Sequence, residues 1–327
     1  MFWRVDGHSQ EFVVLFFILS GYVIAFVSSR NEDTARSYFV ARAARIYSVA
    51  PLAILVTLAA GMIGTKFEPS LYFGHTYFNP HTGIADVLSY LTFTNEIWWR
   101  HAVVGTDEPY WSLGFEVWYY VIFGVALFLP RRSSAVAIPV LLLMVGPKIG
   151  LYFVIWLVGC GTFHMVRRLS AQPRRGLGWV LFLSCPAAYF TIHGEPAAIF
   201  GSSNFGPVLV ESWLYYLTVA ILFAGHILGF SMIASRSTAA VGRLEAAIRW
   251  VAGATFTLYL THQPILICLA ALSPWPAGSV AQVAFVLLGT MGTVFALAEI
   301  GERRKGAWRF AIERLVQVSG LAAQGRS

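Results

Sequence analysis

Residues 11–29 read EFVVLFFILSGYVIAFVSS, and the basic segment that follows, RNEDTARSYFVARAAR, carries arginines at both of its ends. An α-helix needs roughly 20 apolar residues to cross a hydrocarbon core of about 30 Å, so the first stretch is long enough to span a membrane. Arginines directly after such a span mark its cytosolic end. This segment therefore predicts a transmembrane helix that is followed by a cytosolic basic segment.

The same alternation of apolar stretches and basic clusters continues along the chain. All but four of the 23 lysines and arginines fall in short clusters, which are separated by pairs of apolar stretches. Backbone amides in lipid must be hydrogen-bonded internally, and stretches this close in sequence favour helices over a barrel. We expect an all-α, polytopic transmembrane helix bundle of about nine spans. The predicted spans are 11–29, 46–65, 113–129, 133–147, 149–166, 177–193, 208–231, 250–272 and 279–299.

The segments between the spans are of two kinds. The charged residues in the segment 66–112 are mainly acidic. We expect this segment to be an extracytoplasmic loop region that folds around the amphipathic stretch 84–99. Residues 300–327 are basic and are expected to form a cytoplasmic tail, so that residues 1–327 make one membrane domain. The fourth span is short and turns tightly at Pro147, so it is either a full span or a re-entrant hairpin.

Composition argues against several other classes of protein. Hydrophobic residues make up 57% of the chain and charged residues 12%, whereas soluble proteins have about half and about a quarter. The net charge of +7 comes from clusters beside apolar stretches, so no nucleic-acid partner is expected. The three cysteines lie inside apolar stretches and are expected to be small buried hydrophobic residues. No His, Asp and Glu residues have metal-site spacing, so no metal is expected.

Four short motifs stand out in these spans. They are FFILSGY at 16–22, RAARIY at 42–47, YWSLGFE at 110–116 and TLYLTHQP at 257–264. In this order they resemble the FFxLSG(F/Y), RxxRIYP, WSLxxE and SxYLxHxP motifs of the acyltransferase 3 family, polytopic membrane enzymes that O-acylate sugars and other acceptors. The resemblance extends over about residues 8–305.

The chain departs from the family pattern in several places. The family's first helix, which carries an Arg and the His implied as catalytic base, has no counterpart in this sequence. Val14 stands where an acidic residue is common, Ala41 where an Arg is common, and Ser48 where a Pro follows Ile-Tyr. Either the start of the chain is assigned too late, or the chain is a remnant with impaired chemistry.

The resemblance implies acyl-CoA as the donor, and the basic motif then has a chemical role. Arg42 and Arg45 are three residues apart, so on a helix they share one face. Guanidinium groups at the cytosolic mouth can hold the phosphates of acyl-CoA. The alternative is ordinary topology-setting charge, as for the neighbouring Arg36.

Glu116 and Ser112 are four residues apart and share a face at the outer end of the third span. An ionisable group entering a membrane is a candidate functional residue, so Glu116 is expected to orient the acceptor or a catalytic group. The alternative is a carboxylate that the helix dipole favours. Ser112 is expected to be a helix N-cap or a substrate contact rather than a nucleophile, because no Gly-x-Ser-x-Gly elbow surrounds it. Trp111 is expected to contact substrate beside it.

His262 lies near the middle of the eighth span, two residues before Pro264. It is either a hydrogen-bonded structural residue or a polar contact to donor or acceptor, where an imidazole suits proton transfer. Tyr259, one turn earlier, is expected to orient His262 or to contact substrate. The histidines of the outer loop, His101 among them, are expected either to contact a sugar or to be solvated.

The function that the resemblance implies is that of a membrane O-acyltransferase. It would move an acyl group, with acetyl expected, from cytosolic acyl-CoA to a hydroxyl of a cell-surface glycan, a lipid-linked sugar or a secreted small molecule. The expected location is a bacterial-type inner membrane, where the protein contacts lipid and its C-terminus is cytoplasmic. The alternatives are a polytopic transporter or flippase, and a truncated inactive homologue that acts as a partner. A transporter would tend to show two related halves, and no internal repeat is visible.

Overall fold

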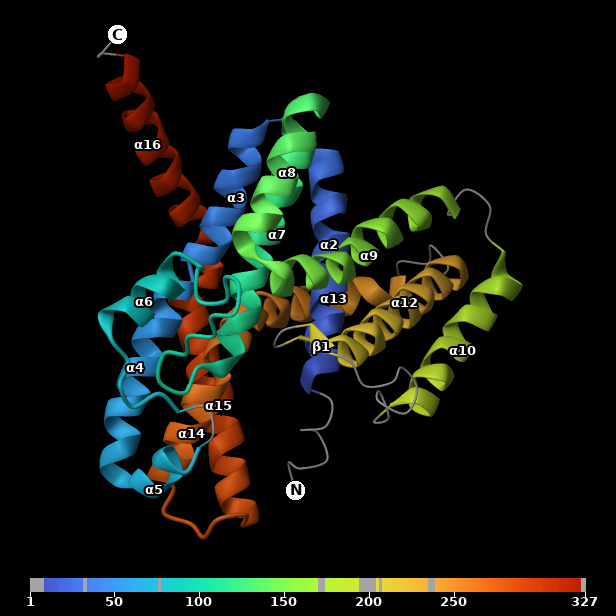
Figure 1. Ribbon diagram of the computed structural model, residues 1–327. Coiled ribbons are helices and arrows are strands. Elements are labelled where there is room, and N and C mark those ends of the chain that lie inside the picture. Colours follow the sequence, from blue (N-terminus) through green and yellow to red (C-terminus); the bar gives the residue numbers. More distant parts are fainter. Residues whose placement is uncertain are drawn as a thin grey trace. The chain divides into compact units, whose positions relative to one another are not determined.

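The helices of the protein gather into two compact units in the computed structural model (Figure 1). Among the described residues the only strands are β1 (Asn204–Phe205) and β2 (Val208–Leu209), which pair antiparallel. The all-α prediction is therefore confirmed. The structure describes residues 9–31, 34–75, 78–169, 174–193, 204–205, 208–234 and 239–324.

Each predicted span contains a helix, although not every helix is a strong candidate to cross a membrane. Within the described residues, seven segments are long and apolar enough to do so. The helices α8 and α10 are not among them, because α8 has 15 residues and α10 begins with an arginine and contains a proline. A polytopic bundle is confirmed, with seven such segments rather than nine. The helices are α2 (Ser9–Asn31), α4 (Ala50–Phe67), α7 (Trp111–Phe128), α8 (Arg131–Val145), α9 (Pro147–Leu169), α10 (Arg175–Ile192), α12 (Val210–Ile233), α14 (Thr255–Leu272) and α15 (Val280–Ile300).

Two predicted spans begin too early because a separate helix precedes each of them. The basic segment forms its own helix α3 (Ala35–Tyr47), whose N-cap Thr34 accepts a hydrogen bond from the backbone N–H of Ser37. The chain then restarts as α4, with a proline in the first turn, where a missing N–H costs nothing. In the same way α13 (Ala239–Ala252) precedes α14.

The first unit comprises residues 1–33, 97–99 and 121–237, and its centre is the contact between α2 and α9. At Gly21 an added Cβ would overlap the backbone oxygen of Trp156, and at Gly159 it would overlap that of Ile18. The Trp156 indole also donates to the hydroxyl of Ser20 at 3.2 Å. Small residues thus let the two backbones touch, as expected for helices that pack in lipid.

A second glycine in this unit allows the sharp turn from α8 into α9. Gly146 adopts a positive φ of 88°, and a Cβ there would lie 2.7 Å from Cα of Trp98. Its neighbour Val145 accepts a hydrogen bond from the Trp98 backbone at 2.9 Å. The turn is tight, as predicted, but it is centred on Gly146, so that Pro147 already belongs to α9.

The second unit comprises residues 34–96, 100–120 and 238–327. Figure 1 shows α4, α14 and α15 running alongside one another, and α14 packs against both of the others. The tail forms the helix α16 (Lys305–Gln324), which packs on α3. There Arg36, which is exposed, donates to the backbone oxygen of Glu313 at 3.4 Å.

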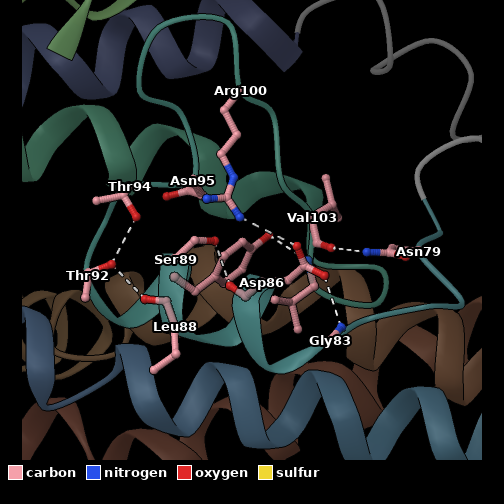
Figure 2. Close-up of polar contacts among 12 residues, drawn as sticks. Asn79, Gly83, Asp86, Leu88, Ser89, Thr92, Thr94, Asn95, Arg100 and Val103 are labelled. Carbon is pink, nitrogen blue, oxygen red and sulfur yellow. Dashed lines mark hydrogen bonds and ion pairs between the residues drawn. The ribbon is translucent and has the colours of Figure 1, made fainter. Parts of the chain in front are cut away.

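The region 66–112 is folded, as predicted, although its main helix is shorter than expected. It contains α5 (Pro69–Phe73), α6 (Ile84–Leu91) and the 3₁₀ helix η1 (Glu108–Tyr110). Figure 2 shows the polar contacts around α6. Asp86 accepts from the Gly83 backbone at 3.0 Å, and Arg100 lies 3.8 Å from the same carboxylate. The stretch after α6 is thereby held without helical structure.

The cysteines behave as the sequence predicts. Cys160, Cys185 and Cys268 are buried and free of disulfides. Each occupies a buried position on its helix, which is usual for a free cysteine acting as a small hydrophobic residue.

Candidate functional site

Arg42 and Arg45 of α3 differ from the other basic residues nearby in their burial. The Arg42 side chain is 6% exposed, and its guanidinium lies 4.2 Å from the ring centroid of Tyr38. Arg45 is half-buried, with its guanidinium 5.4 Å from the Phe256 ring. Arg36, on the same helix, is exposed. Charge that only sets topology needs no burial, so the burial of Arg42 and Arg45 favours a specific role for them.

Arg45 and Glu116 come together in the second unit. The Glu116 carboxylate is 1% exposed and accepts a hydrogen bond from the Tyr120 hydroxyl, one turn further along α7. Arg45 interacts electrostatically with Tyr120 and Glu116. A buried carboxylate is costly unless it is paired and hydrogen-bonded, and here it has both kinds of partner. The structure thus brings the second and third motifs together through the electrostatic interaction of Arg45 with Glu116 and Tyr120.

Glu302 is a further member of this cluster. It lies in η2 (Glu302–Arg304), directly after α15, and also interacts electrostatically with Arg45. Its carboxylate accepts from the backbone N–H of Thr257 at 2.9 Å, from the Thr257 hydroxyl at 3.0 Å and from the backbone N–H of Phe256 at 3.4 Å. Glu302 therefore caps the first turn of α14, the position that the helix dipole favours for a negative charge.

Ser112 and Tyr259 join the third motif to the fourth. Ser112 is fully buried, and its hydroxyl is hydrogen-bonded to the Tyr259 hydroxyl. It also donates to the backbone oxygen of Pro109 at 3.3 Å. Ser112 is the second residue of α7, so the expectation that it is the N-cap is wrong. The reason is that η1 runs directly into α7, which moves the start of the helix to Trp111.

His262 is half-buried and turned onto the backbone of its own helix. Its Nδ1 lies 2.9 Å from the carbonyl oxygen of Tyr259 and 3.1 Å from that of Leu258. These acceptors hold the proton on Nδ1, which leaves the lone pair of a neutral ring on Nε2. Tyr259 thus orients His262 through its carbonyl oxygen, while its hydroxyl faces Ser112.

Trp111 is half-buried at the start of α7 and packs edge-to-face on Phe115, with ring centroids 5.1 Å apart. In the sequence, Trp111 directly precedes Ser112, which belongs to the buried hydroxyl pair. A substrate contact at Trp111 stays a prediction.

A buried acid that the sequence did not single out lies just before η1. Asp107 is fully buried, and burial together with the nearby Glu108 carboxylate raises the pKa of Asp107 well above its usual range, with the Thr57 hydroxyl opposing that rise. Its backbone oxygen accepts from the Tyr90 hydroxyl at 2.9 Å, and Tyr90 stacks on Tyr110 at 3.9 Å. Burial at the base of the loop region thus favours the protonated form of Asp107.

Sequence reasoning missed the roles of Glu302, Asp107 and the pair Glu96–His101. Glu302 stands 45 residues from Thr257, and no local pattern predicts a cap supplied from that distance. Asp107 looks like any loop acid in the sequence. Only the closing Glu-Arg stretch of the chain, which includes Glu302, carries a signal, because it also resembles the family.

No group of three or more His, Cys, Asp or Glu side chains could hold a metal among the residues that the structure describes. The first unit has an apolar cavity of about 210 Å³ between α10 and α12, lined by Cys185, Tyr189, Leu222 and His226 among others. None of the predicted site residues lines it. The predicted site residues lie instead around Arg45 and Ser112 in the second unit.

Comparison with known proteins identifies the family. The family model described as an acyltransferase domain, of the acyltransferase 3 family, matches residues 1–299. Neither the curated proteins nor the solved structures include a significant match to the chain. The matched region contains all the residues that form the clusters around Arg45 and Ser112, except for the cap Glu302. With its polytopic helical fold, the chain therefore belongs to the acyltransferase 3 family of integral membrane proteins.

Proposed function

We propose that the protein is a membrane O-acyltransferase that moves an acyl group, with acetyl expected, from cytosolic acyl-CoA to a hydroxyl group beyond the membrane. The acceptor is a cell-surface glycan, a lipid-linked sugar or a secreted small molecule. Family membership supports acyl transfer in general. The observation that carries the proposal is the buried cluster of Arg42, Arg45 and Glu116, since a membrane segment retains such charges only where they have partners or a function.

Arg42 and Arg45 are proposed to hold the phosphates of acyl-CoA. These two arginines lie one turn apart on α3, and each guanidinium group can donate in pairs to phosphate oxygens. Arg45 also faces two carboxylates, which reduce the local positive charge. The charge of Glu302 is met by the amides of α14, and that of Glu116 by the Tyr120 hydroxyl, so Arg45 can still attract an anion.

Glu116 and His262 are proposed as the groups that act on the reacting atoms, with Trp111, Ser112 and Tyr259 as substrate contacts. The Tyr259 hydroxyl can donate to a developing oxyanion when it turns away from Ser112. Glu116 orients its neighbours through Tyr120 and Arg45. The proposed setting is a bacterial-type inner membrane, with lipid around the helices and a cytoplasmic C-terminus, which places the basic segment at the donor side.

The test measures label transfer in membranes that contain the protein. Labelled acetyl-CoA is added, and ester-linked label is measured as the fraction released by mild alkali. Arg45→Ala should lower transfer about 10- to 100-fold, since a hydrogen bond to a charged group contributes roughly 1.5–3 kcal/mol. Glu116→Gln should lower it to a similar extent. The control Arg36→Ala removes the same charge from an exposed position of α3 and should leave transfer unchanged. Equal effects of Arg36→Ala and Arg45→Ala would show that the cluster only sets topology.

A further inference from the structure

The loop region contains a carboxylate–imidazole pair that the mechanism above does not use. Nδ1 of His101 lies 2.8 Å from Oε1 of Glu96. The Glu96 side chain is 2% exposed, whereas that of His101 is 46% exposed. A buried acid therefore holds one nitrogen of a ring whose remainder reaches the surface of the second unit.

The backbone on both sides of the pair is fixed by polar contacts (Figure 2). The N–H of Ala102 donates to the backbone oxygen of Asn95 at 3.1 Å, which closes the loop that carries Glu96 and His101. Arg100, next to His101, points towards the Asp86 carboxylate of α6. The side chain of Asn79 donates to the backbone oxygen of Val103 at 2.9 Å. His101 thus sits between anchored residues, which is the support that a preorganised catalytic group needs.

The pair also lies against the start of α7, where the hydroxyl cluster is found. The Asn95 side chain is fully buried, and its Oδ1 is 2.8 Å from the place of a Cβ on Gly114. Only a glycine permits this approach, and the Asn95 amide in turn lies 3.5 Å from Oε1 of Glu96. Glu108 interacts electrostatically with His101 and Glu96, and Tyr259 interacts with Glu108. Glu108 is thus close enough to influence both the pair and Tyr259 electrostatically.

We propose that His101 is the general base that takes the proton from the acceptor hydroxyl, and that Glu96 is its positioning residue. This inference rests on the proposed acyl transfer and names the group that activates the acceptor. With Nδ1–H donating to the carboxylate, the neutral ring carries its lone pair on Nε2. Glu96 also stabilises the imidazolium that forms, which is the role of the carboxylate in acid–base–nucleophile triads.

The proposed step balances as follows. The acceptor O–H bond breaks and its proton passes to Nε2 of His101, while the oxygen forms a bond to the thioester carbonyl carbon. The C–S bond then breaks, and the imidazolium returns the proton to the departing sulfur. The products are the O-acyl ester and free coenzyme A, and no oxidant or reductant is needed. Positioned bases of this kind contribute about 10²- to 10⁴-fold to the rate.

His262 is less suited to this step. Its Nδ1 donates to neutral carbonyl oxygens of its own helix, so no carboxylate in those contacts stabilises a positive ring. The charged groups that face His101 are Glu96 and Glu108, with Arg100 adjacent in sequence. Two carboxylates against one neighbouring arginine favour the imidazolium that the reaction forms.

The test replaces the ring and then supplies it from solution. His101→Gly in membranes given labelled acetyl-CoA should lose at least 100-fold in alkali-labile label transfer. Added free imidazole should restore part of the rate in a concentration-dependent way, which a merely structural role would not produce. His81→Gly removes an exposed histidine of the same loop region and should transfer at the normal rate, with or without imidazole.

A second variant covers the case in which His101→Gly does not fold. His101→Gln keeps a donor for Glu96 but cannot accept the proton, so it should fold and lose transfer. Glu96→Gln should lower transfer about tenfold. It should also shift the acidic limb of the pH–rate profile to lower pH, because the imidazolium loses its carboxylate partner. Normal transfer by His101→Gln, or loss in a folded His101→Gly that imidazole does not restore, would overturn the inference. Absence of transfer by the unmodified protein would overturn the proposed function instead.

Discussion

Replacing Asp107 with Asn should make the stability of the protein less dependent on pH. Asp107 is fully buried, and its pKa is raised well above its usual range by burial and by the nearby Glu108. In the unfolded chain the carboxyl ionises at an ordinary pKa near 3.8. At a pH between the unfolded and the folded pKa, the protein therefore holds one more proton at this position when folded than the unfolded chain does.

The sign and the size of the effect follow from this difference. A raised folded-state pKa contributes stability that is complete below the unfolded pKa and is lost as pH rises towards the folded pKa. One proton corresponds to about 1.4 kcal/mol per pH unit. Asn is nearly isosteric with the neutral acid and has no proton to lose. The free energy of unfolding of Asp107→Asn should therefore exceed that of the wild type by an amount that grows by about 1.4 kcal/mol per pH unit within this window.

The assay is thermal unfolding of the detergent-purified protein at several pH values from 5 to 8. A change of 1 kcal/mol corresponds to a few degrees in the midpoint temperature, about 2–4 °C for domains of 150–250 residues. The matched control is Glu68→Gln, which removes a carboxylate from an exposed position of the same loop region. Its midpoint should follow the wild type at every pH. A constant difference between Asp107→Asn and wild type from pH 5 to 8 would refute the reasoning.

Three further variants test separate features. Gly21→Ala should destabilise the first unit by about 1–3 kcal/mol, because the added Cβ overlaps the Trp156 backbone, whereas Gly161→Ala on α9, with open space around it, should not; thermal unfolding measures both. Glu302→Ala should cost about 1 kcal/mol as a lost cap and also lower label transfer, because the capped start of α14 carries Tyr259, which bonds Ser112. Arg42→Ala should raise the acyl-CoA concentration needed for half-maximal transfer about tenfold or more, and an unchanged value would remove Arg42 from the donor site.

Much of the fold could be predicted because membrane insertion is a local property of the sequence. Each span shows as an apolar run, and the close contact at Gly21 shows as a small residue within such a run. The start of a helix was less predictable where another helix runs into it. Ser112 looked like a cap because the sequence does not show that η1 precedes α7 without a break.

The candidate site could be predicted only in part. Motif spacing identified Glu116, Arg45 and Tyr259, since each belongs to a separate conspicuous stretch. The motif separates Arg42 from Arg36 in the sequence, but their different burial is not visible there, because the facing helices decide which side of α3 is covered. Contacts between distant or irregular segments, such as that of Glu302 with Thr257, produce no periodic pattern in the sequence.

The cap at the start of α14 has a practical consequence for engineered forms of the protein. The carboxylate that accepts from the amides of Phe256 and Thr257 belongs to Glu302, which follows α15. The start of α14 is therefore capped only when the chain extends beyond α15 as far as Glu302. A stop codon just before Glu302 would let the first turn of α14 unwind, and Tyr259 would drift away from Ser112. If such a shortened protein were inactive, the cause would be the frayed start of α14, and the result would not show that the tail takes part in the chemistry.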